Sequence, residues 1–232
     1  MKHVNLSILL MLFAFTPLLW SGTYAQDRDF GGLGRYAKAN SELLRSDEKY
    51  KVVFMGNSIT KGWANTHPDF FKKNGYVGRG ISGQTSYQFL LRFREDVIKL
   101  NPKLVVINAG TNDIAENTGP YNEDYTFGNI VSMVELAEAN GIKVILTSTL
   151  PAAAFGWNPS ISNVADKIIA LNKRVKKYAH DKKLPYIDYY KVMVTGRNRA
   201  LNPTYTHDGV HPTADGYAVM ERLVKKAIDR LL

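Results

Sequence analysis

The chain has 232 residues, no cysteine and a formal net charge of +9 at pH 7. The missing cysteines exclude a disulfide framework, thiolate catalysis and cysteine-ligated zinc. The positive charge would suit a nucleic-acid-binding protein, but the basic residues are dispersed over helical segments whose opposite faces are apolar. This pattern favours an ordinary solvated surface, with attraction to acidic glycans or membrane surfaces as the alternative.

The N-terminal segment has the layout of a secretory signal peptide. A basic start is followed by a largely apolar run over residues 5–20 and by a small-x-small cleavage pattern at residues 23–25. A membrane anchor is the alternative, but Pro17 interrupts the run, which is also short for a bilayer span. We therefore predict a signal peptide over residues 1–25 and export to the periplasm or beyond the cell. The remaining residues, 26–232, are expected to form a single domain without a membrane span.

Short apolar or β-branched segments recur along the rest of the chain, with helix-like segments between them. The expected strands are residues 51–55, 76–80, 104–109, 143–149 and 185–189. The expected helices are residues 86–100, 122–140, 166–179 and 214–232. Continuous apolar runs of this length are typical of parallel strands that are buried on both faces. The alternation predicts a three-layer α/β/α domain with a five-stranded parallel sheet.

A serine stands where the first expected strand turns into a helix, in the motif Gly56-Asn57-Ser58-Ile59-Thr60. Ligands of open α/β sheets bind beyond the carboxyl ends of the strands, so residues that follow strands are candidates for an active site. Ser58 is well placed there for nucleophilic attack, because its N–H points the same way as the helix N-terminus. The alternative is an ordinary N-cap serine. Thr60 replaces the second glycine of the Gly-x-Ser-x-Gly motif, so the α/β-hydrolases are not indicated.

A glycine-rich loop follows the second expected strand, where residues 78–83 have the pattern Gly-x-Gly-x-x-Gly. In dinucleotide-binding folds this pattern follows the first strand, and an acid closes the next strand about 20 residues later. Here the nearest acids, Glu95 and Asp96, fall inside an expected helix. We therefore expect no nucleotide cofactor. A glycine loop of this kind can instead present backbone N–H groups to an oxyanion.

The third expected strand ends in Gly110-Thr111-Asn112-Asp113. The side-chain amide of Asn112 is able to donate a hydrogen bond to a developing oxyanion, while Asp113 is able to brace the loop. An Asx turn at the end of the strand is the alternative. The sequence alone leaves both interpretations open.

An acid and a histidine, Asp208 and His211, lie just before the last expected helix. A carboxylate three residues from a histidine can hold the imidazole in one tautomer, so that the ring accepts the proton of a serine hydroxyl. As a metal site the pair offers too few ligands, and no other histidine or acid shows ligand spacing. We therefore expect Asp208 and His211 to act with Ser58, and we expect no metal and no other cofactor.

Together these motifs resemble those of the SGNH hydrolases, the superfamily of GDSL-like esterases and acylhydrolases, over nearly the whole expected domain. The resemblance rests on Gly56-Asn57-Ser58-Ile59, Gly80-Ile81-Ser82-Gly83, Gly110-Thr111-Asn112-Asp113 and Asp208-x-x-His211. It implies a flavodoxin-like fold, with Ser58 as nucleophile, His211 as base and Asp208 as the carboxylate that orients it. It also implies an oxyanion hole made by the N–H groups of Ser58 and Gly83 and by the Asn112 side chain.

Two positions depart from the family pattern. Asn57 stands where an Asp usually precedes the serine, and Gln84 stands where an Asp usually follows the glycine of the second motif. Both residues keep a hydrogen-bonding side chain of similar size and remove a negative charge. Neither position performs chemistry in the implied mechanism, so we expect activity to be retained and acidic substrates to be tolerated better.

The loop after the fourth expected strand, residues 151–157, is expected to overhang the site. Its small residues, together with Phe155 and Trp157, favour a compact pocket with an aromatic wall for a sugar ring, and Asn57 is a further candidate for the lining. The alternative is that the two aromatic residues only pack the loop down. We find no long apolar lid for a fatty chain, so short acyl groups, acetyl foremost, are favoured.

The expected function is thus an exported esterase that hydrolyses a small ester or an acetylated glycan. In the family it resembles, carbohydrate O-acetylesterases and the platelet-activating-factor acetylhydrolase type are the most similar members. Two other classes stay open: a lysophospholipase or thioesterase with a longer acyl pocket, and a catalytically silent glycan-binding module on the same fold. The complete set of Ser58, Asp208 and His211 argues against the silent module. No nucleic acid is expected as a partner, and the sequence makes no prediction of the oligomeric state.

Overall fold

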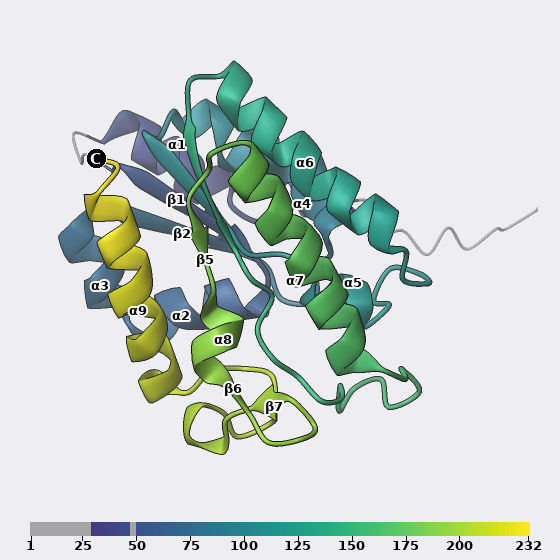
Figure 1. The fold of residues 1–232 in the computed structure, drawn as a ribbon. Coiled ribbons are helices and arrows are strands. Elements are labelled where there is room, and N and C mark those ends of the chain that lie inside the picture. The colour runs from purple at the N-terminus through teal and green to yellow at the C-terminus, as the bar shows by residue number, and fades with distance from the viewer. Residues whose placement is uncertain (1–28, 47–49) are drawn as a thin grey trace, which may run out of the picture.

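A computed structural model of the chain describes residues 29–46 and 50–232 (Figure 1). The signal peptide predicted over residues 1–25 lies outside the described residues. The described part is built on a five-stranded parallel sheet with helices on both faces, which confirms the predicted three-layer α/β fold. None of the helices in this part is both long enough and apolar enough to cross a bilayer.

The central sheet has the strand order β2-β1-β3-β4-β5, and every strand is parallel to its neighbours. Its strands are β1 (Val52–Gly56), β2 (Tyr76–Gly80), β3 (Leu104–Ile107), β4 (Lys143–Thr147) and β5 (Tyr186–Ile187). In the register of β2, β1 and β3, Val53 lies between Val77 and Val105. Because the strands are parallel and in this register, the loops that follow β1, β2 and β3 leave the sheet at the same edge.

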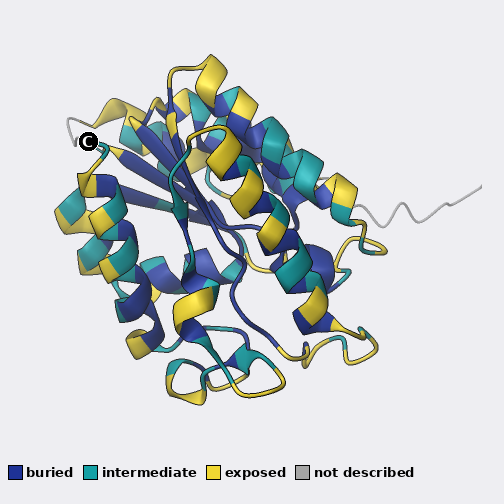
Figure 2. Cartoon of the chain, in the orientation of Figure 1, coloured by how far each residue is buried: buried dark blue, intermediate teal, exposed yellow. Residues whose placement is uncertain are grey.

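Helices cover the two faces of the sheet (Figure 1). One layer contains α1 (Ala37–Arg45), α4 (Ser86–Asp96), α6 (Glu123–Ala139) and α7 (Val164–Asp181), and the other contains α2 (Ser58–Thr66), α3 (Pro68–Asn74) and α9 (Ala214–Asp229). In β1, Val53 and Met55 belong to the core of the first layer, whereas Val52 and Phe54 belong to the core of the second. This alternation is the period of two of a strand that is buried on both faces. In Figure 2 the strands of the sheet have mostly the colour of buried residues.

The boundaries differ from the predicted ones mainly at element ends. The helix expected over residues 86–100 is α4 followed by a short 3-10 turn, η1 (Ile98–Leu100), because Val97 leaves helical geometry with φ −128° and ψ −65°. Several elements were not predicted: α1, α3, α5 (Thr111–Ile114), α8 (Tyr189–Met193), β6 (Val194–Thr195), β7 (Ala200–Leu201) and η2 (Pro203–Tyr205). All of them except α1 and α3 have two to five residues, which is too few for a periodic sequence pattern.

Local caps fix the helices that border the functional edge of the sheet. Thr85 and Gln88 form a capping box at the start of α4. Asn122 caps α6 by accepting a hydrogen bond from the Tyr125 N–H at 3.0 Å, and Gly141, with φ 70°, follows the end of this helix. These caps hold the loops that enter α4 and α6 in defined positions.

Candidate active site

Ser58 is the first residue of α2 and follows directly after the turn that ends β1. Asn57 caps this helix, because its side-chain oxygen accepts a hydrogen bond from the Ile59 N–H at 2.9 Å. The N–H groups in the first turn of a helix have no intrahelical partner, so that of Ser58 can serve a ligand. Asn57 itself is only 1% exposed, and its predicted place in the substrate lining is therefore wrong. Its side chain is turned onto the helix it caps.

The side chains of Ser58, His211 and Asp208 form a continuous chain of hydrogen bonds. Ser58 Oγ lies 2.8 Å from His211 Nε2, and His211 Nδ1 lies 2.6 Å from Asp208 Oδ2. A carboxylate at this distance accepts the Nδ1 proton, which leaves Nε2 of a neutral imidazole as the acceptor of the serine hydroxyl. The fold thus brings Ser58 together with a histidine that is 153 residues away in the sequence.

Asp208 is held by the loop that contains it. Its Oδ1 accepts hydrogen bonds from the N–H groups of Val210 at 2.9 Å and His211 at 2.8 Å, and from the Thr206 hydroxyl at 3.2 Å. Partial burial acts to raise the pKa of Asp208, but the hydrogen bonds from the His211 N–H, the His211 ring and the Val210 N–H outweigh it and lower the pKa to about 2. Asp208 is therefore a carboxylate at neutral pH.

Gly83 and Asn112 line the same hollow as Ser58 and His211. Gly83 has a φ of 78°, a left-handed conformation that glycine adopts without strain. Asn112 is buried, and its Nδ2 donates one hydrogen bond to the Gln84 carbonyl at 2.9 Å. A carboxamide nitrogen carries two hydrogens, so the second hydrogen of Asn112 is available to a ligand oxygen.

The hollow has a volume of about 370 Å³ and is lined by Ser58, Ser82, Gly83, Asn112, Asn117, Trp157 and His211. Trp157 is 46% exposed, and its Nε1 donates to Asn117 Oδ1 at 3.0 Å. Its ring centroid lies 6.2 Å from that of His211, so Trp157 forms a wall of the hollow. Phe155 is only 1% exposed and packs in the core, with its ring 5.0 Å from that of Trp157. The prediction that Phe155 lines the substrate pocket is therefore wrong, because its side chain anchors the loop.

Asp113 connects α5 to the start of α4. Its two carboxylate oxygens accept the Ser86 N–H at 3.0 and 3.1 Å, and they also accept the Ser86 hydroxyl and, at 3.4 Å, the Thr126 hydroxyl. Burial raises the pKa of Asp113, and the hydrogen bonds from Ser86 oppose this effect. The structure thus gives Asp113 the bracing position and places its neighbour Asn112 at the hollow.

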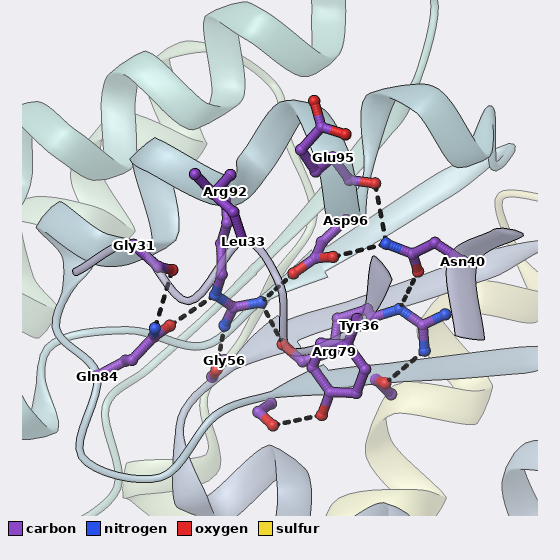
Figure 3. Close-up of polar contacts among 12 residues, drawn as sticks. Gly31, Leu33, Tyr36, Asn40, Gly56, Arg79, Gln84, Arg92, Glu95 and Asp96 are labelled. Carbon is purple, nitrogen blue, oxygen red and sulfur yellow. Dashed lines mark hydrogen bonds and ion pairs between the residues drawn. The ribbon is translucent and has the colours of Figure 1, made fainter. Parts of the chain in front are cut away.

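Arg92, a buried residue that was not predicted from the sequence, forms hydrogen bonds with the last residue of β1 and with the loop that follows β2 (Figure 3). Arg92 is fully buried and forms an ion pair with Asp96, with Nη1 2.8 Å from Oδ2. Its other N–H groups donate to the carbonyls of Gly56 and Arg79, both at 3.0 Å, and to the Gln84 side chain at 2.6 Å. The available signal was an Arg and an Asp four residues apart within an otherwise amphipathic helix.

The described residues contain no group of three or more His, Asp or Glu side chains arranged to hold a metal ion. What the site offers is a serine hydroxyl hydrogen-bonded to a histidine, a carboxylate behind that histidine, and N–H donors around the same hollow. Such a set is suited to attack by the hydroxyl on a carbonyl carbon, with the N–H groups receiving the negative charge that develops on oxygen.

Comparison with known proteins points to one group of relatives. A family model described as the GDSL-like Lipase/Acylhydrolase family matches residues 54–219. The crystal structure of a GDSL-like lipase from Bacteroides thetaiotaomicron VPI-5482 is 65% identical, covers 88% of this chain and 100% of its own, and has a TM-score of 0.85. A protein from Bacteroides fragilis NCTC 9343, provisionally described as an acylhydrolase, is 68% identical over 87% of this chain and 98% of its own, also with a TM-score of 0.85.

A more distant relative is an acetylxylan esterase from Xylanibacter ruminicola. It is 22% identical to this chain, and the match covers 85% of the chain. The chain spans about half of the length of this relative, 49%. The similarity therefore concerns one part of a larger protein.

Proposed function

The chain belongs to the GDSL-like lipase/acylhydrolase family, and on this premise we propose that it is a serine esterase with Ser58 as its nucleophile. The observation that carries the proposal is the hydrogen-bonded chain from Ser58 through His211 to Asp208 at the carboxyl edge of the sheet. Gly83 and Asn112 line the same hollow, where an ester carbonyl would bind.

In the proposed mechanism, His211 Nε2 takes the Ser58 proton while Ser58 Oγ attacks the ester carbonyl carbon. The carbonyl oxygen becomes an oxyanion in the tetrahedral intermediate. His211 then gives its proton to the leaving alcohol oxygen, the carbon–oxygen bond breaks, and an acyl-Ser58 remains. A water molecule, deprotonated by His211, attacks the acyl carbon and releases the acid, which returns Ser58 to its hydroxyl form.

Three donors stabilise the oxyanion in this proposal: the N–H groups of Ser58 and Gly83 and the second hydrogen of Asn112 Nδ2. Such donors are already in place before the charge develops, so no reorganisation is needed during the reaction. Asp208 stays charged because its pKa is lowered to about 2, and it stabilises the imidazolium that His211 becomes.

The substrate proposed is a short-chain ester, acetyl foremost, on a carbohydrate. Trp157 is the one large apolar side chain among the residues that line the hollow of about 370 Å³, which leaves little apolar surface for a long acyl chain. Trp157 is 46% exposed, so its indole ring can pack against a sugar ring. The acetylxylan esterase among the relatives supports the same substrate class.

We also propose that residues 1–25 are a signal peptide, that residues 26–232 form a single exported domain, and that no cofactor is required. The support for export is the order of basic, apolar and small residues at the N-terminus. Mass spectrometry of the protein recovered from the producing cells would test this. A first residue of Gln26 is expected, and a chain that retains residues 1–25 would contradict it.

The esterase proposal is tested with p-nitrophenyl esters of increasing chain length. Acetyl and butyryl esters should be hydrolysed much faster than octanoyl esters, because the hollow is small and Trp157 is the one large apolar side chain among the residues that line it. EDTA should leave the rates unchanged. Equal or better rates on octanoyl esters would indicate a lysophospholipase or thioesterase, and a protein that binds acetylated glycans without hydrolysing any ester would be a silent module.

A further inference from the structure

Gln84 forms hydrogen bonds with three separate parts of the chain, of which Figure 3 shows those at Gly31 and Arg92. Its side-chain oxygen accepts a hydrogen bond from Arg92 Nε at 2.6 Å, and its Nε2 donates to the Gly31 carbonyl at 3.0 Å. Its backbone carbonyl accepts the hydrogen bond from Asn112 Nδ2 at 2.9 Å. An Asp, which the family pattern has at this position, would accept from Arg92 but would have no hydrogen for the Gly31 carbonyl. The glutamine therefore makes a connection that the usual residue cannot make.

The Gly31 carbonyl belongs to a short segment near the N-terminus, residues 29–33, which we call the strap. Asp29 closes the turn within the strap by accepting a backbone N–H at 2.7 Å. The Phe30 carbonyl accepts a second hydrogen bond from outside the strap, from Gln88 Nε2 at 2.8 Å. Two glutamine side chains that flank the start of α4 thus hold two successive carbonyl groups of the strap.

We propose that the strap and Gln84 position the two oxyanion donors of the esterase site, Gly83 and Asn112. Gln84 directly follows Gly83, and its carbonyl holds the Asn112 amide, so a shift of Gln84 moves both donors. The strap keeps the Gln84 side chain on Arg92, which is fully buried. The inference rests on the proposed function, and it assigns the strap a positioning role.

Arg92 extends the same connection to the nucleophile. Its Nη2 donates to the carbonyl of Gly56, which stands two residues before Ser58. The nucleophile and the oxyanion donors are therefore fixed to one buried guanidinium. Errors in their relative position are costly, since a shift of about 1 Å in a reacting group can reduce a rate by roughly 10².

Gly32 offers a way to move Gln84 without changing any group of the site. Its φ is 69°, and a Cβ at this position would lie 2.6 Å from Gln84 Nε2. Gly32→Ala should therefore displace the Gln84 side chain and reduce kcat roughly tenfold to a hundredfold with KM nearly unchanged. Gly141→Ala is the matched control, because Gly141 has the same left-handed backbone, with a φ of 70°, and a Cβ there would meet no atom within 4 Å.

Covalent labelling of Ser58 by an alkyl fluorophosphonate, followed by intact mass, measures the same effect without depending on one ester. Gly32→Ala should be labelled roughly tenfold to a hundredfold more slowly than the wild-type protein, and Gly141→Ala should be labelled at the wild-type rate. Wild-type protein that is not labelled would contradict the proposed function, and the inference with it. Equal labelling of wild-type and Gly32→Ala protein would overturn the inference alone.

A double mutant separates positioning from general stability. If Gly32→Ala acts by moving the oxyanion donors, adding it to Asn112→Ala should cost less activity than the sum of the two separate losses, because one of the two donors is then already missing. Gln84→Glu, which keeps an acceptor for Arg92 and loses the donor to Gly31, should behave in the same way. Losses in kcat that add fully to that of Asn112→Ala would show that the strap has a purely structural role.

A second, independent observation concerns a hollow of about 530 Å³ between the starts of α4 and α6. Its lining includes four aromatic side chains and no charged residue, although the chain carries a net charge of +9. Three of these aromatic residues are among the exposed large hydrophobic residues of the described chain: Phe30, Tyr87 and Tyr125. Exposed aromatic side chains gathered at a concave surface are typical of a binding site.

The aromatic hollow adjoins the esterase hollow. Asn117 lines the esterase hollow, and the next residue, Thr118, lines the aromatic one. The segment is held in place, since Asn117 Nδ2 donates to the Gly83 carbonyl at 2.9 Å and the Thr118 hydroxyl is hydrogen-bonded to that of Thr85 at 3.1 Å. A ligand that reaches from Ser58 across this segment would enter the aromatic hollow.

We infer that this hollow binds neutral sugar residues next to the esterified one. Aromatic rings pack against the C–H faces of a sugar, while the Tyr hydroxyls and the Asn122 amide can hydrogen-bond to sugar hydroxyl groups. The absence of charge in the lining fits an uncharged glycan better than an acidic one. The inference rests on the proposed function and specifies its substrate as an oligosaccharide or polysaccharide.

The test compares two esters of different size. Tyr125→Ala and Tyr87→Ala should each raise KM for acetylated xylo-oligosaccharides roughly tenfold and leave p-nitrophenyl acetate hydrolysis unchanged. Leu44→Ala, at an exposed apolar residue of α1, is the control. Unchanged KM for the oligosaccharide would overturn the inference, and so would an effect confined to p-nitrophenyl octanoate, which would assign the hollow to an acyl chain.

Calorimetric titration of Ser58→Ala protein with unacetylated xylo-oligosaccharide tests the hollow without any turnover. Binding that Tyr125→Ala weakens is expected even if the proposed esterase chemistry were wrong. Binding that is equally strong in the presence and absence of the Tyr125 ring would contradict the inference.

Discussion

The two sides of the proposed active site are held by different kinds of contact. On the acid–base side, the Asp208 and His211 side chains are 53% and 38% exposed, and their partners lie within three residues of them in the sequence or across the hollow. On the oxyanion side, the Arg92 and Asp96 side chains are 0% and 1% exposed. There the partners come from distant parts of the chain, as with the Gln84 bond to Gly31.

This difference predicts which changes should affect chemistry alone and which should also affect folding. The acid–base loop can lose a side chain without opening the core, because water replaces the lost contacts. The oxyanion side cannot, because each buried polar group that loses its partner stays away from water. The comparison predicts loss of activity with retained stability on the first side, and loss of both for the buried network on the second.

The largest effect is expected from the base. His211→Ala should lower kcat by about 10⁶, because the proton of Ser58 then has no acceptor, and the double mutant with Ser58→Ala should be little worse. The melting temperature should change little, since the His211 side chain is partly exposed. Kinetics and thermal melting of the two single mutants and the double mutant would check this. A large loss of stability in His211→Ala would contradict the comparison.

A smaller loss is expected from the residue behind the base. Asp208→Asn should lower kcat by roughly 10⁴, because an amide no longer favours the tautomer with hydrogen on Nδ1. Its fold should again be retained, as Asn keeps an acceptor for the N–H groups of Val210 and His211. Turnover near the wild-type level would show that Asp208 does not orient His211.

On the oxyanion side, Arg92→Leu should cost stability first. Removing the guanidinium leaves Asp96 buried without its partner, a change typically worth about 3–5 kcal/mol. Denaturant unfolding measures this loss. Arg92→Lys, which keeps a positive charge near Asp96 but loses the fork of donors, should recover part of the stability. An Arg92→Leu protein as stable as the wild type would remove the distinction between the two sides.

Asn112 and Asp113 allow a test within the oxyanion side, because they are adjacent, both are buried, and only Asn112 lines the hollow. Asn112→Ala should cost roughly 10²–10³ in kcat, or about 3–4 kcal/mol, with KM nearly unchanged, and it should also lower the melting temperature, because it leaves the buried Gln84 carbonyl without its donor. Asp113→Ala should show mainly a loss of stability, because it leaves the Ser86 N–H without an acceptor. Undiminished kcat in Asn112→Ala would remove Asn112 from the site.

The smallest effects are changes of folding stability with pH. Their signs are opposite for Asp208 on the acid–base side and Asp113 on the oxyanion side. The folded pKa of Asp208 is about 2, below its ordinary 3.8, so its stabilising contribution is present above 3.8 and is lost as pH falls through 2. Burial raises the pKa of Asp113 above 3.8, so its contribution is largest at low pH and is lost as pH rises above 3.8. The effect of Asp208 should be small, because the side chain is about half exposed.

Melting curves between pH 2 and pH 7 check these signs. The difference in melting temperature between wild-type and Asp208→Asn protein should grow as pH rises from 2 to 4. The difference between wild-type and Asp113→Asn protein should shrink as pH rises above 3.8. The same sign for both pairs would contradict the contrast between an exposed and a buried carboxylate.

Much of the fold could be predicted from the sequence, because each buried strand corresponds to a short, continuous run of apolar residues. The five expected strands all occur, and the predicted family and fold class are confirmed. The roles of Ser58, His211 and Asp208 stay predictions, although the structure brings these side chains together. They were accessible to sequence reasoning because the ends of parallel strands meet at one edge, so separate motifs could be assigned to one place.

What the sequence could not provide are contacts that depend on tertiary packing. Nothing local shows that Gln84 bonds to a residue 53 positions away, or that Arg92 is turned into the core. For the same reason Phe155 and Asn57 were wrongly expected to line the pocket. Phe155 packs beneath its loop, and Asn57 caps its helix. Both orientations depend on neighbouring residues that the sequence of a single loop does not contain.

The central claim is that Ser58 attacks an ester carbonyl, and the most direct test is the hydrolysis of p-nitrophenyl acetate by pure wild-type and Ser58→Ala protein. The wild-type protein should turn over the ester, and Ser58→Ala should be slower by about 10⁶ in kcat while it keeps the wild-type melting temperature. Turnover by a correctly folded Ser58→Ala protein near the wild-type rate would contradict the account.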